Sequence, residues 1–374
     1  MYTVGLDVHS NTSSICVLDD GGCVVQERTL RGNPRRVIDH LTDLRRQSGQ
    51  ALKICFEASC NYGWLHDQLS GVCERVAVAH PGQLRLIFRS KKKNDRVDAQ
   101  KLAKLLHLNE VPLVYVPGVD TRSWRAMIEH RTSLVNKRTR AKNALRAILR
   151  SQAVVLPEGK KGAWLWCKAG RKWLGALVLM LPSDMVRRDM LLEEVEHHDK
   201  QIKRVTEELD RIGQTHAGIT LLRTMPGVGP RTSEAVCAYI DDPKRFSKIK
   251  CVASYFGLVP SQDSSAGTNR LGRITKQGPG TVRRLLVEAA WRGICKSPSL
   301  QAMHLRISRD DPDRRKRALV AVAHHMLRTM LSMLRSGCVW EERLATAFIP
   351  PAVDGGTTAS TKTKKPRIAA ELEG

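Results

Sequence analysis

Short apolar runs alternate with helix-like stretches through residues 1–110, and this alternation constrains the fold more than any other feature. Residues 2–8, 13–18 and 22–30 have the pattern of three strands, and the turn sequence Asp-Asp-Gly-Gly at 19–22 joins the last two. Helical patterns over 34–47, 62–69 and 94–108 then alternate with apolar strands over 52–57 and 75–79. The predicted order of elements is therefore β-β-β-α-β-α-β-α.

That order belongs to the ribonuclease-H-like fold, a mixed sheet with helices packed on its faces, and we predict this α/β domain over residues 1–112. Long helical patterns over 121–152 and 184–215 indicate a basic, coiled-coil-like domain over 113–215, whose helices pair antiparallel or across a dimer. Short helices and a long one over 314–335 predict a mostly helical domain over 216–345. The Pro-, Gly-, Thr- and Lys-rich end of the chain predicts a disordered tail over 346–374.

The chain is strongly basic, with 62 Lys and Arg against 37 Asp and Glu and a formal net charge of +25. The excess is concentrated, because residues 81–150 carry 17 basic and 5 acidic side chains and residues 216–374 carry 26 and 13. This excess of positive charge indicates a polyanionic partner. The hydrophobic residues, 42% of the chain, exclude global disorder. No apolar run reaches the roughly 20 residues of a membrane span, so we expect nucleic acid and no membrane.

The N-terminus and the cysteines bear on the location of the protein. The opening sequence Met-Tyr-Thr-Val-Gly-Leu-Asp lacks a basic segment followed by an apolar run, so it does not resemble a signal peptide. None of the ten cysteines forms a Cys-x-x-Cys pair, which argues against a zinc ribbon and for reduced thiols. We therefore expect a cytoplasmic protein.

Four carboxylates fall where this fold would bring them together. Asp7 ends the first predicted strand and Glu57 the fourth, and Asp95 and Asp98 lie three residues apart on one helix. The first and fourth strands are neighbours in such a sheet, so the four side chains would converge. Their oxygen ligands suit Mg²⁺ or Mn²⁺, and a pair of such ions supports phosphoryl transfer. Each residue alone also fits an ordinary role as a turn, cap or helix-terminal charge. The adjacent His9 is as compatible with a structural role as with a catalytic one.

A second candidate site is a small-residue loop in the basic C-terminal region. It reads Ser261-Gln-Asp-Ser-Ser-Ala-Gly267 and carries two adjacent serines, Ser264 and Ser265. A serine hydroxyl needs a base or a metal to become a nucleophile, and arginines would stabilise the charge of an attacked phosphate. The downstream cations are Arg270, Arg273, Lys276, Arg283 and Arg284. Chemistry alone favours a phosphate-binding loop over a nucleophile, because Ser-Ser-x-Gly is a common sequence.

The sequence Pro226-Gly-Val-Gly229 between two predicted helices is typical of a helix-hairpin-helix motif. Gly227 and Gly229 would let backbone N–H groups approach a phosphate, and the N-terminus of the following helix would add its dipole. An ordinary tight turn between helices is the alternative interpretation.

Together these residues resemble the transposases of the insertion-sequence-110 family, from about residue 2 to about residue 335. The matching motifs are Gly5-Leu-Asp-Val-His9, Glu57-Ala-Ser59 with Tyr62, Lys93-Asn-Asp-Arg-Val-Asp-Ala99, Pro226-Gly-Val-Gly229, Phe256-Gly-Leu-Val-Pro260 and Gly272-Arg-Ile-Thr-Lys-Gln-Gly278 with Arg283-Arg-Leu-Leu286. Each motif is loose alone, but their order and spacing are specific. The chain departs from the family pattern at Cys60 and Ala266, where glycine is usual, and at Asn94, where threonine is usual.

The resemblance implies a RuvC-like DEDD domain followed by a transposase domain. By that resemblance Asp7, Glu57, Asp95 and Asp98 are catalytic ligands of Mg²⁺ or Mn²⁺. Ser265, with Ser264 as the second choice, attacks DNA and forms a covalent phosphoserine link. The family joins the two halves of the site from different subunits, which implies a homo-oligomer, either a dimer or a tetramer. It also uses a structured noncoding bridge RNA that pairs with donor and target DNA.

The nucleic-acid contacts that we predict share a basic or glycine-rich sequence. They are Lys91, Lys92, Lys93, Arg138, Arg140, Lys142, Gly227, Gly229, Arg270, Arg273, Lys276 and Arg283. Two other functions stay open, a RuvC-like Holliday-junction nuclease that uses water as the nucleophile and an inactive nucleic-acid-binding protein. A simple nuclease needs no second basic domain, and an acidic cluster without a metal would only repel DNA.

Overall fold

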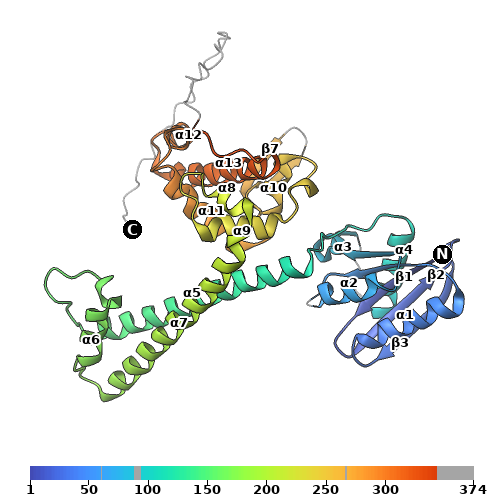
Figure 1. Cartoon of the computed structure of the whole chain (residues 1–374), viewed down its shortest axis with the longest axis horizontal. Helices are drawn as coiled ribbons and strands as arrows, with labels where there is room; N and C mark the ends of the chain where they lie inside the picture. The colour runs from blue at the N-terminus through green and yellow to red at the C-terminus, as the bar shows by residue number, and fades with distance from the viewer. Residues whose placement is uncertain (60, 88–93, 266–267, 343–374) are drawn as a thin grey trace, which may run out of the picture.

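The computed structural model describes residues 1–59, 61–87, 94–265 and 268–342, without the side chains of residues 264, 265, 268 and 269. Figure 1 shows three parts: an N-terminal sheet with its helices, a long pair of helices, and a helical C-terminal body. The predicted tail over 346–374 lies outside the described residues. No helix in the described part of the chain is both long enough and apolar enough to cross a membrane.

The N-terminal part contains a mixed sheet of five strands. These are β1 (Tyr2–Val8), β2 (Thr12–Leu18), β3 (Val24–Arg31), β4 (Leu52–Glu57) and β5 (Arg75–Ala79), in the spatial order β3-β2-β1-β4-β5. Strand β1 pairs antiparallel with β2 and parallel with β4. The prediction of a ribonuclease-H-like sheet with the first and fourth strands side by side is therefore confirmed.

Helices cover both faces of this sheet because its central strands are apolar on both sides. Helices α1 (Arg35–Ser48) and α2 (Tyr62–Ser70) pack on the face that carries Val4 and Leu6. Helix α4 (Asp95–His107) packs on the other face, against Cys55 and the strand ends at Ala77 and Ala79. The short helix α3 (Pro81–Ile87) was not predicted from the sequence.

The approach of α4 to the sheet depends on one glycine. A Cβ atom at Gly5 would lie 2.0 Å from the backbone oxygen of Ala99 and 2.4 Å from the backbone nitrogen of Ala103. Only glycine lets the backbones of β1 and α4 come so close. This contact holds the middle of α4 against the middle of β1.

Two helices have 33 residues each, α5 (Val119–Ser151) and α7 (Pro182–Gln214). Helix α5 leads from the sheet to the end that carries α6, and α7 returns along it to the C-terminal body (Figure 1). They confirm the two long helices expected from the sequence. The intervening stretch, which the sequence could not place, contains η1 (Trp164–Trp166) and α6 (Lys168–Ala176). Leu165 and Leu174 of this stretch are buried against Leu149 of α5.

The C-terminal body surrounds one long helix, α13 (Arg315–Ser336), whose side chains from Ala318 to Met333 enter the core. Around it lie α8 (Ala217–Leu222), α9 (Pro230–Ile240), η2 (Pro243–Arg245), α10 (Ile249–Tyr255), α11 (Gly280–Gly293), α12 (Pro298–Ser308) and η3 (Pro312–Arg314). The serine segment, expected as a loop, instead forms an antiparallel hairpin of β6 (Pro260–Ser265) and β7 (Thr268–Ile274). A polar, solvent-exposed hairpin lacks the apolar alternation by which strands are recognised.

Candidate active site

The first candidate site lies at the carboxyl ends of β1 and β4. The register pairs Leu6 with Phe56, so the next residues along these parallel strands are Asp7 and Glu57. Side chains alternate along a strand, so Asp7 points to the same face as Gly5, the face that α4 covers. Helix α4 begins at Asp95, where the Asn94 side chain caps it by accepting a hydrogen bond from the Arg96 N–H.

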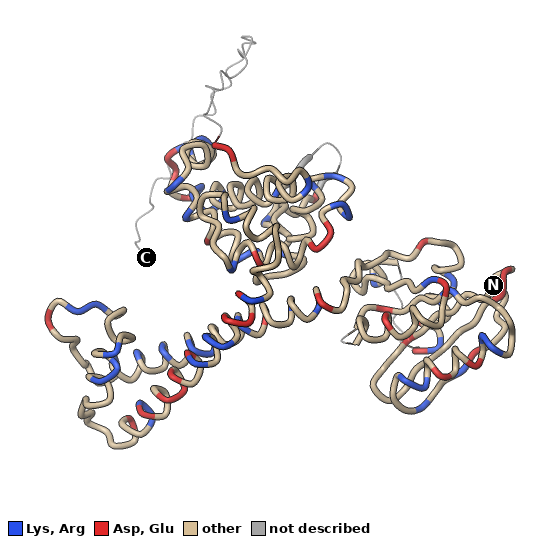
Figure 2. Tube along the Cα trace, viewed as in Figure 1, with Lys and Arg blue, Asp and Glu red and all other residues tan. Residues whose placement is uncertain are grey.

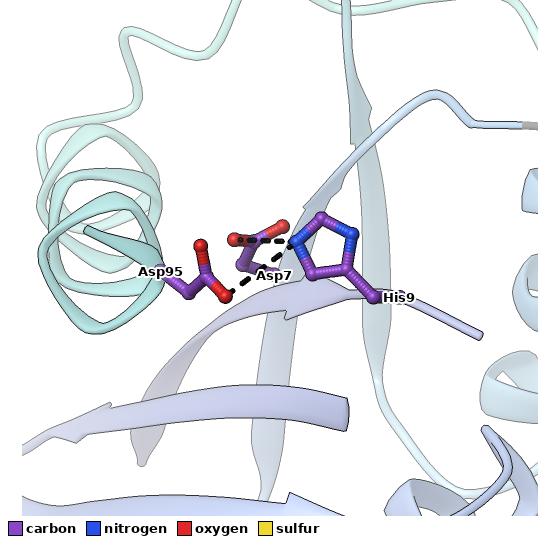
Figure 3. A group of neighbouring side chains, drawn as sticks. All are labelled: Asp7, His9 and Asp95. Carbon is purple, nitrogen blue, oxygen red and sulfur yellow. Dashed lines mark ion pairs between the residues drawn. The ribbon is translucent and has the colours of Figure 1, made fainter. Parts of the chain in front are cut away.

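Three side chains meet at this edge of the sheet (Figure 3). The His9 Nε2 atom lies 3.4 Å from Asp7 Oδ2 and 3.8 Å from Asp95 Oδ2. One ligand atom from each of the three residues lies within 4.8 Å of the others. Asp7 is mostly buried, with a side chain 16% exposed, whereas Asp95 opens to solvent. Two carboxylates and an imidazole held by a strand end and a helix start make a donor set that fits a divalent cation.

The structure does not bring all four predicted carboxylates into this group. Among the described residues, neither Glu57 nor Asp98 belongs to the cluster of potential ligands. Glu57 is exposed at the end of β4, and Asp98 forms an ion pair of 3.0 Å with Lys101 on the next turn of α4. His9 takes part instead. The sequence signal for it was its position two residues after Asp7.

The serine hairpin forms the second candidate site. Ser264 and Ser265 end β6 opposite Asn269 and Thr268. Arg270, Arg273 and Lys276 are exposed along β7 and just after it. The outer surface of the hairpin is therefore basic and open to a polyanion.

Arg283 has a different place from the other predicted contacts of this region. Its Nη1 atom donates hydrogen bonds to the carbonyl oxygens of Phe256, at 3.2 Å, and Gly278, at 3.1 Å, and a further one to that of Gln277. It thus ties the exit of the hairpin to the end of α10. In this structure Arg283 holds the hairpin base rather than facing outward.

The glycine turn before α9 is shaped by packing. Gly227 has φ +84°, and a Cβ there would lie 2.4 Å from the Ala289 oxygen and from the Gly293 nitrogen of α11. Gly229 has open space beside it and precedes the first turn of α9. Gly227 is therefore needed for the fold itself, while the backbone at Gly229 is accessible from outside.

Figure 2 shows Lys and Arg positions recurring along α5. The predicted contacts among them divide into side chains with partners in this structure and a side chain without an ion pair. Arg138 forms an ion pair of 2.7 Å with Asp199 of α7, which Arg171 also contacts. Burial favours the neutral form of Asp199, but these hydrogen bonds outweigh it and hold its pKa below the usual range. Lys142 lies 4.7 Å from the centre of the Trp166 ring, and burial lowers its pKa.

Arg140, in contrast, is exposed and forms no ion pair within the described part of the chain. Lys91, Lys92 and Lys93 lie outside the described residues. Of the predicted contacts on α5, Arg140 is thus the one whose charge is available to a partner.

Comparison with known proteins covers both candidate sites. Residues 4–153 match a family model described as a transposase with the DEDD domain of the IS110 group. Residues 219–305 match the model of the transposase IS116/IS110/IS902 family. The chain belongs to this transposase family. The predicted family is confirmed, and a transposase of this family binds DNA. Its DEDD domain points to a divalent metal, in agreement with the cluster at Asp7, His9 and Asp95.

Individual relatives are bacterial and distant in sequence. The chain is 24% identical over 295 residues to the transposase for insertion sequence element IS1111A of Coxiella burnetii, which covers 77% of this chain and 76% of that protein. It is 26% identical over 243 residues to the transposase for insertion sequence element IS1328 of Yersinia enterocolitica, covering 63% of this chain and 69% of that one. The similarity therefore extends over most of both chains.

Proposed function

We propose that this transposase is the recombinase of its insertion sequence and that it exchanges DNA strands through a covalent phosphoserine intermediate. The observation that carries the proposal is the geometry at the end of β1, where Asp7, His9 and Asp95 come together in the region matched by the DEDD model. A second basic site with adjacent serines lies in the region matched by the other transposase model. Cytoplasmic location in a bacterium is part of the same proposal.

Asp7 and Asp95 would hold the divalent cation, with Glu57 and Asp98 near the same sheet edge as the remaining family ligands. His9 would supply a nitrogen donor or orient the two carboxylates. A bound divalent cation neutralises charge on a phosphate and polarises its oxygens. The strand end and the capped helix start keep these side chains in place before DNA arrives, which favours the transition state over the free substrate.

Ser265, or Ser264 as the second choice, would attack a DNA phosphate through its hydroxyl oxygen. A new bond forms between that oxygen and phosphorus while the bond from phosphorus to the neighbouring sugar oxygen breaks. The serine proton passes to a base, and the released sugar oxygen ends as a hydroxyl group. Strand exchange is the reverse reaction with the hydroxyl group of another strand. The phosphoserine link keeps the energy of the broken phosphodiester bond, so joining needs no further energy source.

Figure 1 shows the sheet and the serine hairpin in separate parts of the chain, with the N-terminal half of α5 between them. This separation supports a site assembled from two subunits of a homo-oligomer, a dimer or a tetramer. The exposed cations of α5 and β7 support binding of donor and target DNA and of a structured noncoding bridge RNA, which would choose the sequences. Electrostatic contacts of this kind give affinity without base specificity.

The test is a covalent-adduct assay with Mg²⁺, the RNA from the flanks of the element and end-labelled donor and target DNA. Denaturing gels would compare the natural chain with Ser265→Ala and Ser264→Ala. We expect a protein–DNA adduct that Ser265→Ala abolishes and Ser264→Ala retains. Cleaved DNA without an adduct in all three proteins would identify water as the nucleophile and a RuvC-like nuclease instead. An adduct formed without RNA would contradict guidance by RNA.

A mixing experiment tests assembly of the site from two subunits. Asp7→Ala chains keep the serine half and Ser265→Ala chains keep the carboxylate half. Each protein alone should form no adduct, whereas subunits exchanged in a mixture should restore it in part. A mixture as inactive as its components would place both halves in one subunit.

A further inference from the structure

A cleft of about 780 Å³ lies where α5 and α7 meet the C-terminal body, apart from both candidate sites. Its wall is formed by α5, by the turn before α9 with the start of that helix, by α11, and by one residue each of α7 and α13. The apolar part of the wall comes from Ile128, Val135, Leu285, Val287 and Leu319. A cleft of this size and lining accommodates a flat organic group of the size of a nucleotide.

One aromatic side chain stands open at the cleft. Trp291 of α11 lines it and is 57% exposed, although tryptophan usually buries most of its large surface. A large part of the indole ring is thus open to a partner. Successive bases stack on such rings in proteins that bind single strands, whatever the base.

Helix α11 also places two arginines at the cleft. Arg284 and Arg292 line the cleft, are exposed and form no ion pair in the described residues. They lie eight residues apart, about two turns of helix, with Trp291 next to Arg292 and about two turns from Arg284. Glu288 lies between them and is also exposed. A phosphate on either side of a stacked base would meet one of these guanidinium groups.

The inner end of the cleft is polar, and ion pairs nearly balance its charges. Arg231 contacts Glu234 at 3.1 Å and also binds Asp210, and Arg131 donates a hydrogen bond to Thr206. Glu234 is 2% exposed, and burial raises its pKa to about 7. The positive charge of Arg231 opposes this rise, because it favours the ionised carboxylate.

The backbone at Gly229 and the start of α9 complete the rim. We propose that this cleft binds an unpaired nucleotide of a nucleic acid, with its base stacked on Trp291 and its flanking phosphates on Arg284 and Arg292. The inference rests on the proposed function, since it specifies which feature of a bound strand this transposase recognises. An unpaired nucleotide of DNA and one of RNA offer the same base and phosphate, so both are candidates.

The experiment measures binding of the full chain to duplexes with and without one bulged nucleotide, in a DNA set and an RNA set. Trp291→Ala removes the stacking surface and Arg284→Gln with Arg292→Gln removes the charge. Matched controls are Trp64→Ala, at a tryptophan 37% exposed on α2, and Arg306→Gln with Arg309→Gln, at exposed arginines of α12 and its end. Melting temperatures of all variants check that each protein is folded.

We expect the natural chain to bind the bulged duplex about tenfold more tightly than the paired one, as one stacked base provides. Trp291→Ala should remove this preference and leave binding to the paired duplex unchanged. The double arginine variant should flatten the log–log salt dependence by about 0.7–0.9 for each lost contact. The control variants should resemble the natural chain.

Equal binding of bulged and paired duplexes by the natural chain, in both sets, would overturn the inference and leave the proposed function intact. A preference that survives in Trp291→Ala would also overturn it, because the stacking surface would lie elsewhere. Failure to bind any duplex would overturn the proposed function as well. A preference in one set alone identifies whether the bound strand is DNA or RNA.

Discussion

The end of the N-terminal sheet and the serine hairpin differ in how firmly the fold holds them. Asp7 extends from a strand with neighbours on both sides, and α4 packs on β1 at backbone contact distance through Gly5. The hairpin has only two strands, and its described side chains from Ser261 to Asp263 and from Arg270 to Arg273 are exposed. Burial supports the first site, whereas the second is anchored at its base by Arg283.

This difference agrees with the chemistry proposed for each part. Metal ligands must be held within a fraction of an ångström, which a buried strand end and a capped helix provide. A nucleophile that forms and breaks a bond with DNA must instead reach a strand that arrives from outside. Functional residues on exposed segments of a rigid scaffold are common for this reason.

The largest effect is expected from Asp7→Asn, which keeps the shape of the side chain and removes its charge. Loss of a metal-ligating charge should reduce strand exchange at least about 1000-fold, equivalent to about 4 kcal/mol in the barrier. Binding of Mn²⁺, followed by electron paramagnetic resonance, should weaken in Asp7→Asn and persist in Ser265→Ala. The two regions would then be separated into a metal half and a nucleophile half.

Asp43→Asn is the matched control for that comparison, since Asp43 is an exposed carboxylate of α1 whose ion pair within the described residues is with Arg46 on the same helix. It should exchange strands and bind Mn²⁺ like the natural chain. Normal Mn²⁺ binding by Asp7→Asn would contradict the metal role of Asp7 whatever happened to activity.

A pair of glycine substitutions compares the rigidity of the two regions. Gly5→Ala would force a methyl group to 2.0 Å from the Ala99 oxygen, a backbone atom that cannot rotate away. We expect it to destabilise the sheet by about 3 kcal/mol, at the upper end for overpacking. In Gly272→Ala the methyl group would meet the Ser261 Oγ atom at 2.4 Å, and that side chain can rotate. Its effect should stay within about 0.5 kcal/mol, as for most surface changes.

Hydrogen exchange of peptides that cover β1 and β7 measures both effects in the intact chain. Gly5→Ala should speed exchange in β1 and leave β7 unchanged. A small effect of Gly5→Ala, or an equal effect of Gly272→Ala, would mean that the two regions do not differ in rigidity as their packing indicates.

The sequence predicted the helices and strands whose buried residues recur with a regular period. The strands from Tyr2 to Ala79 and both long helices carry apolar patterns of period two or near four, so their type and order followed from the pattern. The short distance between Asp7 and Asp95 was then predicted from the order of these strands and helices. The β6–β7 hairpin did not, because it buries too little to carry such a pattern, and neither did the short helix α3.

The sequence also could not assign partners to charges. Arg138 and Arg283 stand in basic motifs, yet one binds Asp199 and the other binds carbonyl oxygens of its own domain. His9 is a single imidazole beside Asp7, and only the placement of α4 brings it near Asp95. These outcomes depend on contacts between residues far apart in the chain, which local patterns do not contain.

The smallest expected effect comes from two arginines on α5, the helix that links the sheet to the C-terminal body. Arg140→Gln removes an exposed charge and should flatten the log–log salt dependence of nucleic-acid binding by about 0.7–0.9, with the melting temperature unchanged. Arg138→Gln removes the ion pair with Asp199 and should lower stability by about 1 kcal/mol, with the salt dependence unchanged. Titrations between 50 and 200 mM salt, a range over which phosphate contacts change affinity strongly, and thermal melts separate the two results. If Arg138→Gln flattened the salt dependence as much as Arg140→Gln, the ion pair would open on binding, and the linking helix would contact the strand with both of these cations.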